Sequence, residues 1–572
     1  MTGANTLLKI EGLTLGFETP SGIAAALKGI SLSINRGEIL ALVGESGSGK
    51  SVTAMSAMRL LPPKITRIDN GHIQFYPQGE KAVDLLSCPE DVIDGIRGHR
   101  ISMIFQEPMT SLNPLMPCGE QVAEGLRRHL GLDRTEAMAR VEELFSRVRL
   151  PDPTGMLQRY PHQLSGGQKQ RVMIAMAMGC QPDLLIADEP TTALDVTVQR
   201  TILSLIRDLQ RESGMSVLFI THDLGVVADI ADRVAVMYRG EIVESGPTNV
   251  ILTAPSHPYT RALLACRPSL HAPGDRLPVV ADFMSEADNI ASDLADQRLE
   301  PPVASTWSCN EGDAPFLQIR NLRVSYPGRG GTGPALAIDG VDFDIMPGEF
   351  IGLVGESGCG KTTLGRTLLG LVSGAEGKIL HDGRDLLRLS GREWTMMRRK
   401  FQIIFQDPYG SLNPRMRIGE AIAEPMVIHG LHATEAGRRA QVHQLLEKVG
   451  LRKEHYHRYP HEFSGGQRQR IGIARALALN PSFLILDESV SALDVSVQAQ
   501  VLNLLVDLRK AFGFTALFIS HDLMVVRHVC DRILVMHKGR IIERGNAEQI
   551  YRDPQADYTR GLIDAIPGRQ HI

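Results

Sequence analysis

The sequence has few cysteines, no long apolar run and no marked excess of charge of either sign. Its seven cysteines are scattered over 572 residues without a C-x-x-C pair, which argues against a disulfide framework and a zinc site. Its apolar runs, such as residues 217–220 and 533–536, are far shorter than the roughly 20 residues that cross a bilayer. We therefore expect reduced thiols and no membrane-spanning segment.

Neither sign of charge dominates the chain. Lysine and arginine total 61 against 65 aspartate and glutamate, for a formal net charge of -4 at pH 7, so the positive field of a general nucleic-acid binder is absent. The first residues, MTGANTLLKIEG, lack the basic start and apolar stretch of a secretory signal, and we expect a cytoplasmic location. A hydrophobic fraction of 43% and a charged fraction of 22% are typical of globular proteins.

The chain contains a domain-sized internal repeat. The segment GEILALVGESGSGKS, which ends at Ser51, returns as GEFIGLVGESGCGKT, which ends at Thr362. From the LSGGQ that begins at Leu164 and the FSGGQ that begins at Phe463, the two copies keep a constant separation of 299 positions. A repeat of this length predicts two similar domains in one polypeptide.

The segment between the two copies is rich in proline, alanine, serine and aspartate. Residues 268–315 hold nine acidic and two basic side chains, a composition typical of a solvated linker. The sequence therefore predicts a first domain at 1–266, a linker at 267–315 and a second domain at 316–572.

Each copy contains a phosphate-binding loop of the form G-x-x-x-x-G-K-[ST] after an apolar strand. In such a loop, backbone N–H groups and a lysine hold phosphates, and the hydroxyl ligates Mg²⁺. Apolar runs alternate with helical stretches downstream, which predicts an α/β domain with a largely parallel core sheet in each copy. The two loops consist of Gly44, Glu45, Ser46, Gly47, Ser48, Gly49, Lys50 and Ser51, and of Gly355, Glu356, Ser357, Gly358, Cys359, Gly360, Lys361 and Thr362.

Two adjacent carboxylates end a later apolar strand in each copy. They are Asp188 and Glu189 in the first copy and Asp487 and Glu488 in the second. Alone, such a pair is usually a solvated strand end. Behind a phosphate-binding loop it predicts that the aspartate joins the Mg²⁺ shell and that the glutamate polarises the attacking water as general base.

The loops, the acidic strand ends and the pentapeptides LSGGQ and FSGGQ together resemble the ATP-binding-cassette (ABC) family. The resemblance implies two fused nucleotide-binding domains with ATP and Mg²⁺ as cofactors, each with an antiparallel β subdomain and a helical subdomain beside the core sheet. In the family, the pentapeptide opens a helix whose amino terminus faces the γ-phosphate held by the opposite domain. The signature residues are Ser165, Gly166, Gly167 and Gln168, and Ser464, Gly465, Gly466 and Gln467.

The same resemblance implies roles for further residues. Gln106 and Gln406 match the Q-loop glutamine that senses the metal and water, and His222 and His521 match the switch histidine that contacts the γ-phosphate. The aromatic residues upstream of the loops, Phe17 and Tyr326, match those that stack on adenine, but an aromatic residue at a strand end is also commonly core. The implied metal ligands are Ser51, Asp188 and Gln106, and Thr362, Asp487 and Gln406.

Pairing of the two halves into a pseudo-dimer would give two sandwiched ATP sites, each made of the loop of one half and the signature of the other. Neither half lacks the lysine, the base glutamate, the signature serine or the histidine. Both sites are therefore expected to hydrolyse ATP.

Several segments resemble one branch of the family, the ATPase subunits of bacterial importers of dipeptides, oligopeptides, glutathione and nickel. They are FQEPMTSLNP, FQDPYGSLNP and the tail SHPYTRALLACRP, which returns in shortened form as DPQADYTRGLIDAIP. Asn113 and Asn413, which follow the Q-loop glutamines, are candidates either for coupling to a membrane partner or for capping of a local turn.

This branch implies an ATPase on the cytoplasmic face of the inner membrane that energises uptake of a peptide-like solute. Its expected partners are two integral membrane permease subunits and an extracytoplasmic solute-binding protein. One alternative is a soluble twin-cassette ATPase that acts on ribosomes or DNA, in which a charged helix or zinc modules usually accompany the cassettes. An exporter ATPase is the other alternative.

Overall fold

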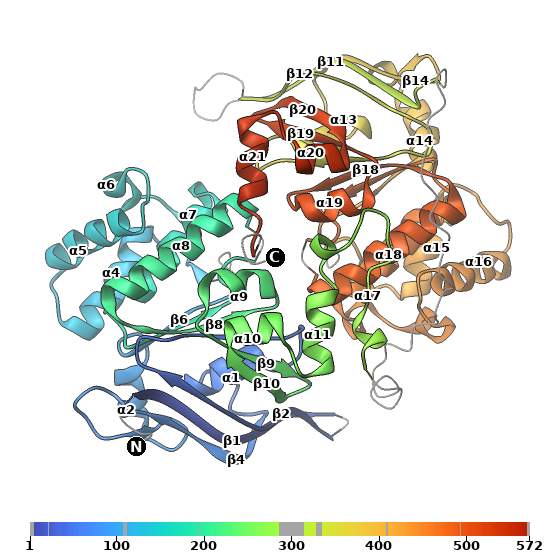
Figure 1. Ribbon diagram of the computed structural model, residues 1–572. Helices are drawn as coiled ribbons and strands as arrows, with labels where there is room; N and C mark the ends of the chain where they lie inside the picture. The colour runs from blue at the N-terminus through green and yellow to red at the C-terminus, as the bar shows by residue number, and fades with distance from the viewer. Residues whose placement is uncertain are drawn as a thin grey trace. The chain divides into compact units, whose positions relative to one another are not determined.

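The chain folds into two compact units (Figure 1). Residues 1–194, 198–264 and 567–572 form the first unit, and residues 195–197 and 265–566 form the second. The structure is a computed structural model and describes residues 5–20, 22–106, 111–192, 194–284, 314–327, 335–407, 410–491 and 493–568.

Among the described residues, the two copies of the repeat have their strands and α-helices in the same order, with two exceptions. The second copy has an additional 3-10 helix (Leu386–Arg388), and it has a 3-10 helix (Lys453–His457) where the first has a short α-helix (Pro153–Met156). The first copy consists of β1 (Thr6–Thr19), β2 (Gly22–Asn35), β3 (Ile39–Val43), α1 (Lys50–Ala57), β4 (Thr66–Phe75), β5 (Val83–Asp84), α2 (Glu90–Ile96), β6 (Ile101–Ile104), α4 (Cys118–Leu130), α5 (Arg134–Arg147), α6 (Pro153–Met156), η1 (Pro161–Gln163), α7 (Gly166–Met178), β7 (Leu184–Asp188), α8 (Val196–Ser213), β8 (Ser216–Thr221), α9 (Leu224–Ile230), β9 (Arg233–Tyr238), β10 (Glu241–Pro247), α10 (Thr248–Thr253) and α11 (Pro258–Ala265).

Two short 3-10 helices precede the second copy. The remaining elements are η2 (Pro268–Leu270), η3 (Val280–Asp282), β11 (Leu317–Tyr326), β12 (Ala335–Ile345), β13 (Phe350–Val354), α13 (Lys361–Leu368), β14 (Ala375–His381), β15 (Arg384–Asp385), η4 (Leu386–Arg388), α14 (Gly391–Lys400), β16 (Phe401–Ile404), α15 (Ile418–Ile428), α16 (Glu435–Lys448), η5 (Lys453–His457), η6 (Pro460–Glu462), α17 (Gly465–Leu477), β17 (Phe483–Asp487), α18 (Val495–Phe512), β18 (Thr515–Ser520), α19 (Leu523–Val529), β19 (Arg532–His537), β20 (Arg540–Asn546), α20 (Ala547–Arg552) and α21 (Asp557–Asp564).

A six-stranded sheet forms the centre of each copy. The strand order is β10-β9-β3-β8-β7-β6 in the first copy and the equivalent β20-β19-β13-β18-β17-β16 in the second. All neighbouring pairs are parallel except β9–β10 and β19–β20. Every residue of β3, β7, β13 and β17 is buried, as in parallel strands covered on both faces. The predicted α/β fold with a largely parallel core is confirmed.

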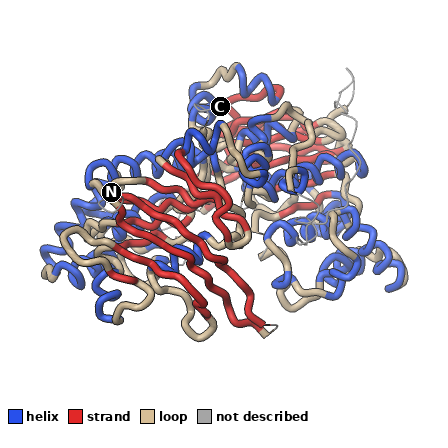
Figure 2. Tube along the Cα trace, turned by 60° about the horizontal axis from the view of Figure 1, so that its bottom comes forward, coloured by secondary structure: helices blue, strands red, loops and turns tan. Residues whose placement is uncertain are grey.

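Each copy also contains a four-stranded antiparallel sheet, with the order β2-β1-β4-β5 or β12-β11-β14-β15 (Figure 2). Its apolar face packs on the core sheet, since Leu13 and Ile73 share one buried cluster with Leu42 and Ile220. The antiparallel subdomain implied by the family resemblance is therefore present in both copies.

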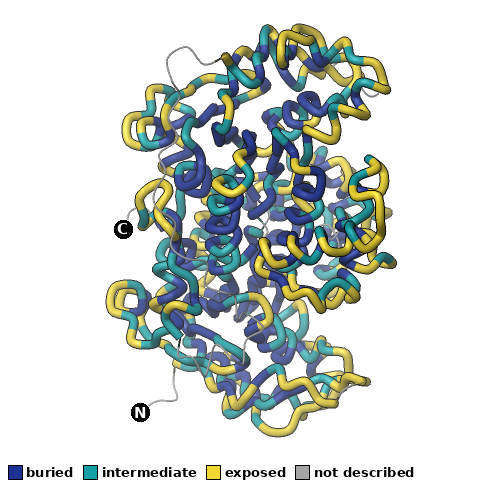
Figure 3. The backbone as a smooth tube through the Cα atoms, turned by 90° about the vertical axis from the view of Figure 1, so that its right-hand side faces the viewer, coloured by how far each residue is buried: buried dark blue, intermediate teal, exposed yellow. Residues whose placement is uncertain are grey.

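The helical subdomain is inserted between the strand before the Q-loop glutamine and the strand that ends in the two carboxylates. In the first copy it comprises α4 to α7, whose buried Val122, Val141 and Phe145 form one cluster with Leu185 and Phe219 of the core sheet. The buried residues lie in the interior of each unit, and the exposed residues lie mainly in the peripheral loops and helices (Figure 3).

The first part of the segment between the copies is folded. Leu277 is 1% exposed, and its backbone N–H and C=O are hydrogen bonded to the Asn503 side chain at 2.9 and 2.8 Å. The N–H of Gly274 donates to the carbonyl of His528 at 2.9 Å. Residues 267–284 therefore differ from the solvated linker that composition suggested, because a few apolar residues among the acidic ones pack against α18 and α19. Residues 285–313 lie outside the described part.

No helix in the described ranges has the length and apolar character needed to cross a bilayer. Six of the seven cysteines are described and all six are free thiols. Among the described residues, no group of three or more histidine, cysteine, aspartate and glutamate side chains is placed to hold a metal ion.

Candidate functional site

Each phosphate-binding loop connects a buried core strand to a helix. In the first copy, Nζ of Lys50 donates to the carbonyl oxygens of Gly44 (2.8 Å) and Glu45 (2.9 Å). The equivalent lysine of the second copy makes the same two contacts at 2.7 and 2.9 Å. Gly49 has φ of 107° at the start of α1, a conformation that favours glycine. The predicted loop, with its lysine directed at its own backbone, is present twice.

The loop hydroxyl of each copy meets the first carboxylate of the strand-end pair. Ser51 Oγ lies 3.1 Å from Asp188 Oδ1, and Thr362 Oγ1 lies 3.0 Å from Asp487 Oδ1. Burial raises the pKa of both aspartates, with a further contribution from the adjacent glutamate. A hydroxyl beside a buried carboxylate suits Mg²⁺, which takes few protein oxygens and completes its shell with water and phosphate.

The second carboxylate of each pair is held in an unusual backbone conformation. Glu189 and Glu488 have φ of 46° and 47°, in the left-handed region that side-chain-bearing residues rarely adopt. Their N–H groups donate to the carbonyls of Ile220 (3.0 Å) and Ile519 (2.9 Å) on the neighbouring strands. Strain of this kind persists where the surrounding structure fixes it and is concentrated at functional sites.

The predicted catalytic residues of the first copy converge on Glu189. Its Oε2 accepts hydrogen bonds from Gln106 Nε2 (3.1 Å) and Thr192 Oγ1 (2.9 Å), and Nδ1 of His222 lies 3.4 Å away. Burial by itself would raise the pKa of Glu189, but His222, Lys50 and Thr192 outweigh it and lower the pKa to about 2. The carboxylate is therefore ionised at neutral pH, as a general base must be.

The second copy brings the equivalent residues together around Glu488. Gln406 Nε2 donates to its Oε2 at 2.8 Å, and His521 Nδ1 lies 3.5 Å from the same oxygen. Nζ of Lys361 lies 3.9 Å from Oε1. Burial opposes ionisation, but His521 and Lys361 lower the pKa of Glu488 on balance. Ser491, the counterpart of Thr192, donates instead to the backbone carbonyl of Glu488 at 2.8 Å.

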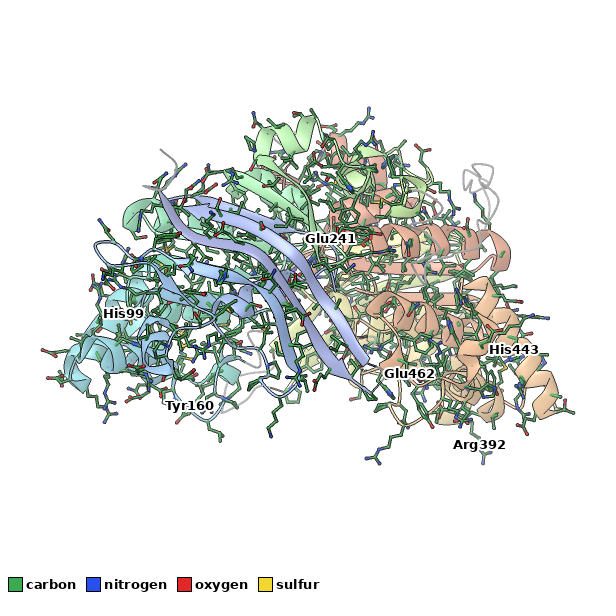
Figure 4. The ribbon with its side chains drawn as sticks, turned by 90° about the horizontal axis from the view of Figure 1, so that it is seen from below. His99, Tyr160, Glu241, Arg392, His443 and Glu462 are labelled. Carbon is green, nitrogen blue, oxygen red and sulfur yellow. The ribbon has the colours of Figure 1, made fainter. Side chains whose placement is uncertain are left out.

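Each signature pentapeptide folds as a capping box. Ser165 is the N-cap of α7: its hydroxyl accepts from the N–H of Gln168 at 3.3 Å, and Oε1 of Gln168 accepts from the N–H of Ser165 at 3.0 Å. Ser464 and Gln467 form the same pair at 3.4 and 3.2 Å. The motif thus fixes a helix start. Tyr160 and Glu462, labelled in Figure 4, belong to the turns that lead into the two motifs.

The two glycines of the signature differ in their surroundings. A Cβ at Gly167 would lie 2.7 Å from Cγ1 of Val198, and a Cβ at Gly466 would lie 2.2 Å from Cγ1 of Val497. A Cβ at Gly166 would meet only a side-chain carbon of Leu194 at 3.6 Å. The second glycine is therefore required by close helix packing, whereas a side chain at the first glycine would meet no steric clash.

The two aromatic residues matched to adenine stacking lie in different surroundings. Phe17 is half-buried on β1 and packs against the core cluster of the first copy, whereas Tyr326, the last residue of β11, is 42% exposed. Tyr326 is therefore more accessible than Phe17, and the adenine-stacking role of both residues stays a prediction.

Asn113 and Asn413 each stabilise a local turn. Oδ1 of Asn113 accepts from the N–H of Leu115, and Oδ1 of Asn413 accepts from the N–H of Arg415, both at 3.0 Å. This is the hydrogen bond of an Asx turn. It favours the local-turn interpretation over a dedicated coupling role.

Sequence reasoning missed several residues that contact the site. Thr192 was not singled out, although its hydroxyl binds the base carboxylate. Tyr259 and Tyr558 lie in the two tail segments that resemble the importer branch, and each hydroxyl contacts a phosphate-binding loop. Their separation of 299 positions, identical to that of the signature residues, was the signal available in the sequence.

Comparisons with known proteins agree with this geometry. The sequence profile of the family described as ABC transporter matches residues 27–192 and 338–491. That of the oligopeptide/dipeptide transporter, C-terminal region, matches residues 243–291 and 542–570. The glutathione import ATP-binding protein GsiA of Salmonella typhimurium strain LT2 is 49% identical over 567 residues, which cover 98% of this chain and 89% of that protein. GsiA of Pectobacterium atrosepticum is 48% identical over 573 residues, with equal coverage.

Two solved structures are each similar to part of this chain. The structure of cbiO1 from Clostridium perfringens is 28% identical, with a TM-score of 0.38, over 42% of this chain and 91% of that one. A dimeric post-hydrolysis state of the ATP-binding cassette MJ0796 bound to ADP and Pi gives the same identity and TM-score, over 42% of this chain and 99% of that one. With profile matches over more than half of its length, the chain belongs to the ABC transporter family, as an ATPase with two fused cassettes and an oligopeptide/dipeptide-type tail.

Proposed function

We propose that this chain hydrolyses ATP to drive the uptake of a peptide-like solute, with glutathione as the first candidate, through separate permease subunits. The observation that carries the proposal is 49% identity to a glutathione import ATP-binding protein over 98% of the chain. It is supported by the full set of hydrolytic residues around both Glu189 and Glu488.

The residues on each carboxylate fit a hydrolytic role. Glu189, ionised and fixed by its strained backbone, accepts the proton of the attacking water, while Gln106 and His222 orient its carboxylate. Lys50 keeps its two hydrogen bonds to the loop carbonyls and directs its third N–H towards the β and γ oxygens of the nucleotide. The second copy repeats these roles with its own residues.

Mg²⁺ is the metal proposed for both sites. The hydroxyl and carboxylate pairs Ser51–Asp188 and Thr362–Asp487 supply oxygen ligands, with Gln106 and Gln406 adjacent through the base glutamates. When bound, the ion neutralises charge that develops on the transferred phosphoryl group.

The proposed cycle requires the signature of one cassette to complete the loop of the other, so that two ATP molecules close the pseudo-dimer. The capping boxes support it, because each leaves a helix amino terminus at which N–H groups and the helix dipole favour a phosphate. Hydrolysis then reopens the pair and passes the motion to the permeases.

The proposed partners are two integral membrane permease subunits and an extracytoplasmic solute-binding protein, which place the chain at the cytoplasmic face of the inner membrane. The tail profile, which matches both copies, supports this assembly. The family profiles name transporters and the relatives name glutathione import, so the alternative of a ribosome- or DNA-acting ATPase has no support from them.

The test is a vesicle uptake assay with the chain, its permeases and its binding protein reconstituted together. ATP-dependent accumulation of glutathione, or of di- and oligopeptides, is the expected result, and the permeases should raise the ATPase rate. A nickel complex serves as the comparison solute. ATP-dependent efflux, or stimulation by ribosomes and not by the permeases, would overturn the proposal.

A further inference from the structure

The last helix of each copy reaches the phosphate-binding loop through one hydroxyl. The hydroxyl of Tyr259, on α11, accepts a hydrogen bond from the N–H of Glu45 at 3.0 Å. The hydroxyl of Tyr558, on α21, accepts one from the N–H of Glu356, also at 3.0 Å. The contact thus occurs twice, between residues that are about 200 positions apart in the sequence.

The N–H in this contact belongs to the peptide group that holds the loop lysine. The N–H of Glu45 and the carbonyl of Gly44 are the two ends of one planar peptide, and that carbonyl accepts from Lys50 Nζ at 2.8 Å. In the second copy the carbonyl of the equivalent glycine accepts from the lysine at 2.7 Å. A tyrosine hydroxyl therefore fixes the orientation of a peptide whose other end positions the lysine.

The tyrosine itself is firmly placed. Tyr259 is fully buried, and its ring centroid lies 4.3 Å from that of Tyr238 at the end of β9. The turn before it is anchored by Glu244 of β10, whose carboxylate accepts from the N–H groups of Ser256 (2.7 Å) and His257 (3.2 Å). These contacts hold the hydroxyl at the loop.

The second copy keeps the same anchor although its tail sequence differs. Glu543 of β20 accepts from the N–H groups of Gln555 (2.7 Å) and Ala556 (3.1 Å), and the ring centroids of Tyr558 and His537 lie 4.1 Å apart. Because the anchor binds backbone groups, the side chains of the turn can change without loss of the contact. The tyrosine, whose side chain makes the contact, is present in both copies.

We propose that Tyr259 and Tyr558 are positioning residues of the two nucleotide sites. Each orients the first peptide of its loop and so presents the lysine to the β- and γ-phosphates. The tail that marks this branch of transporters is, on this account, part of the ATPase machinery as well as a peripheral helix. Without the hydroxyl, the partly buried N–H of Glu45 or Glu356 loses this hydrogen bond. The peptide whose carbonyl binds the lysine is then less firmly oriented.

The experiment compares the full-length chain with the double variant Tyr259→Phe and Tyr558→Phe, which keeps both rings and their packing. We expect affinities for ADP and ATP to fall roughly 3- to 10-fold, the loss expected for one hydrogen bond. Affinity for AMP, which lacks the phosphates that the lysine contacts, should change less than about 2-fold. The KM for ATP should rise by the same factor as the affinity falls, with a smaller change in kcat.

The matched control is Ser256→Ala, which removes a hydroxyl from the same turn, where Gln555 already stands in the second copy. This control should leave the affinities for all three nucleotides unchanged. Unchanged affinity for ADP in the double variant would overturn the proposal. Equal weakening of ADP and AMP, or a lower melting temperature without any change in nucleotide affinity, would show that the tyrosines only support packing.

Discussion

At the scale of single residues, Glu189 and Glu488 combine a strained backbone with an ionised carboxylate. Both have positive φ angles, and their carboxylates contact the glutamine and histidine of the same copy. The lowered pKa values of both groups keep them in the form that accepts a proton. Neighbouring residues therefore set both the position and the charge state of each proposed base.

Replacement of both base glutamates tests this role. In the variant Glu189→Gln with Glu488→Gln, each carboxylate is replaced by an amide of the same size. The amide oxygen can still accept hydrogen bonds, but the amide cannot take a proton from water. We expect turnover to fall by at least about 100-fold, while ATP binding stays within about 2-fold. Steady-state phosphate release and nucleotide binding are the measurements. Glu241→Gln, on an exposed side chain, is the control, and substantial turnover in the double variant would remove both residues from the base role.

At the scale of elements, the signature helices show how a short motif is constrained by packing. The second glycine of each pentapeptide faces a valine of the helix that follows the acidic strand end. The start of α7 and the start of α8 must therefore approach closely, and the same is true of α17 and α18.

We expect Gly466→Ala to displace the start of α17, because its Cβ would lie 2.2 Å from Cγ1 of Val497. Overpacking of this kind costs about 1–3 kcal/mol, and the displaced capping box should lower ATPase activity. Gly472→Ala is the control on the same helix, where a Cβ meets nothing within 4 Å, and it should retain activity. Adding Val497→Ala should restore activity to Gly466→Ala, and failure of this rescue would contradict the steric account.

The folded part of the inter-domain segment covers a titratable side chain, His528. His528 of α19 is 3% exposed beneath residues 271–275. Burial lowers its pKa to about 4, with His271 and Arg527 in the same direction and Asp275 opposed. Because the ordinary pKa of histidine is near 6.5, the unfolded chain takes up the proton first as the pH falls.

The stability contributed by neutral His528 is therefore fully present above about pH 6.5 and is lost as the pH falls towards 4. The loss is on the order of 3 kcal/mol, because the pKa of His528 is about 4 in the folded chain and near 6.5 in the unfolded chain. Hydrogen exchange of residues 274–284 and the melting temperature should both report it. His528→Gln, which cannot titrate, should flatten this dependence; an equally steep pH dependence in that variant would assign the effect to other groups.

The local features that short motifs determine could be predicted from the sequence. Contacts between residues far apart in the chain could not. The loops, the acidic strand ends and the capping boxes could be predicted because each is a local pattern with one geometry, as at Gly49 or Ser165. The contact of Tyr259 with Glu45 joins residues more than 200 positions apart, so no local pattern predicts it. Composition likewise placed Leu277 in a solvated acidic linker, although the Asn503 side chain is hydrogen bonded to both its backbone N–H and its C=O.

At the scale of the whole molecule, two complete sets of hydrolytic residues in one chain raise the question of whether the sites act independently. Both lysines contact the first two carbonyls of their loops at 2.7–2.9 Å, and both base glutamates have the same partners apart from Thr192. Among the described residues, neither site lacks a predicted hydrolytic side chain, so independent sites would contribute comparable rates.

We expect Lys50→Ala or Lys361→Ala alone to reduce ATP turnover well below half. Each variant removes the positive charge that the β and γ oxygens require, and the proposed pseudo-dimer, which closes on two nucleotides, stalls when one site holds no nucleotide. Turnover should fall to about a tenth or less, because the effects of residues that act as a unit are not additive. The control is Lys81→Ala, on an exposed lysine, which should keep the full rate. If either loop-lysine variant retained about half of the original turnover, the sites would fire independently, because half is the rate that one intact and unassisted site supplies.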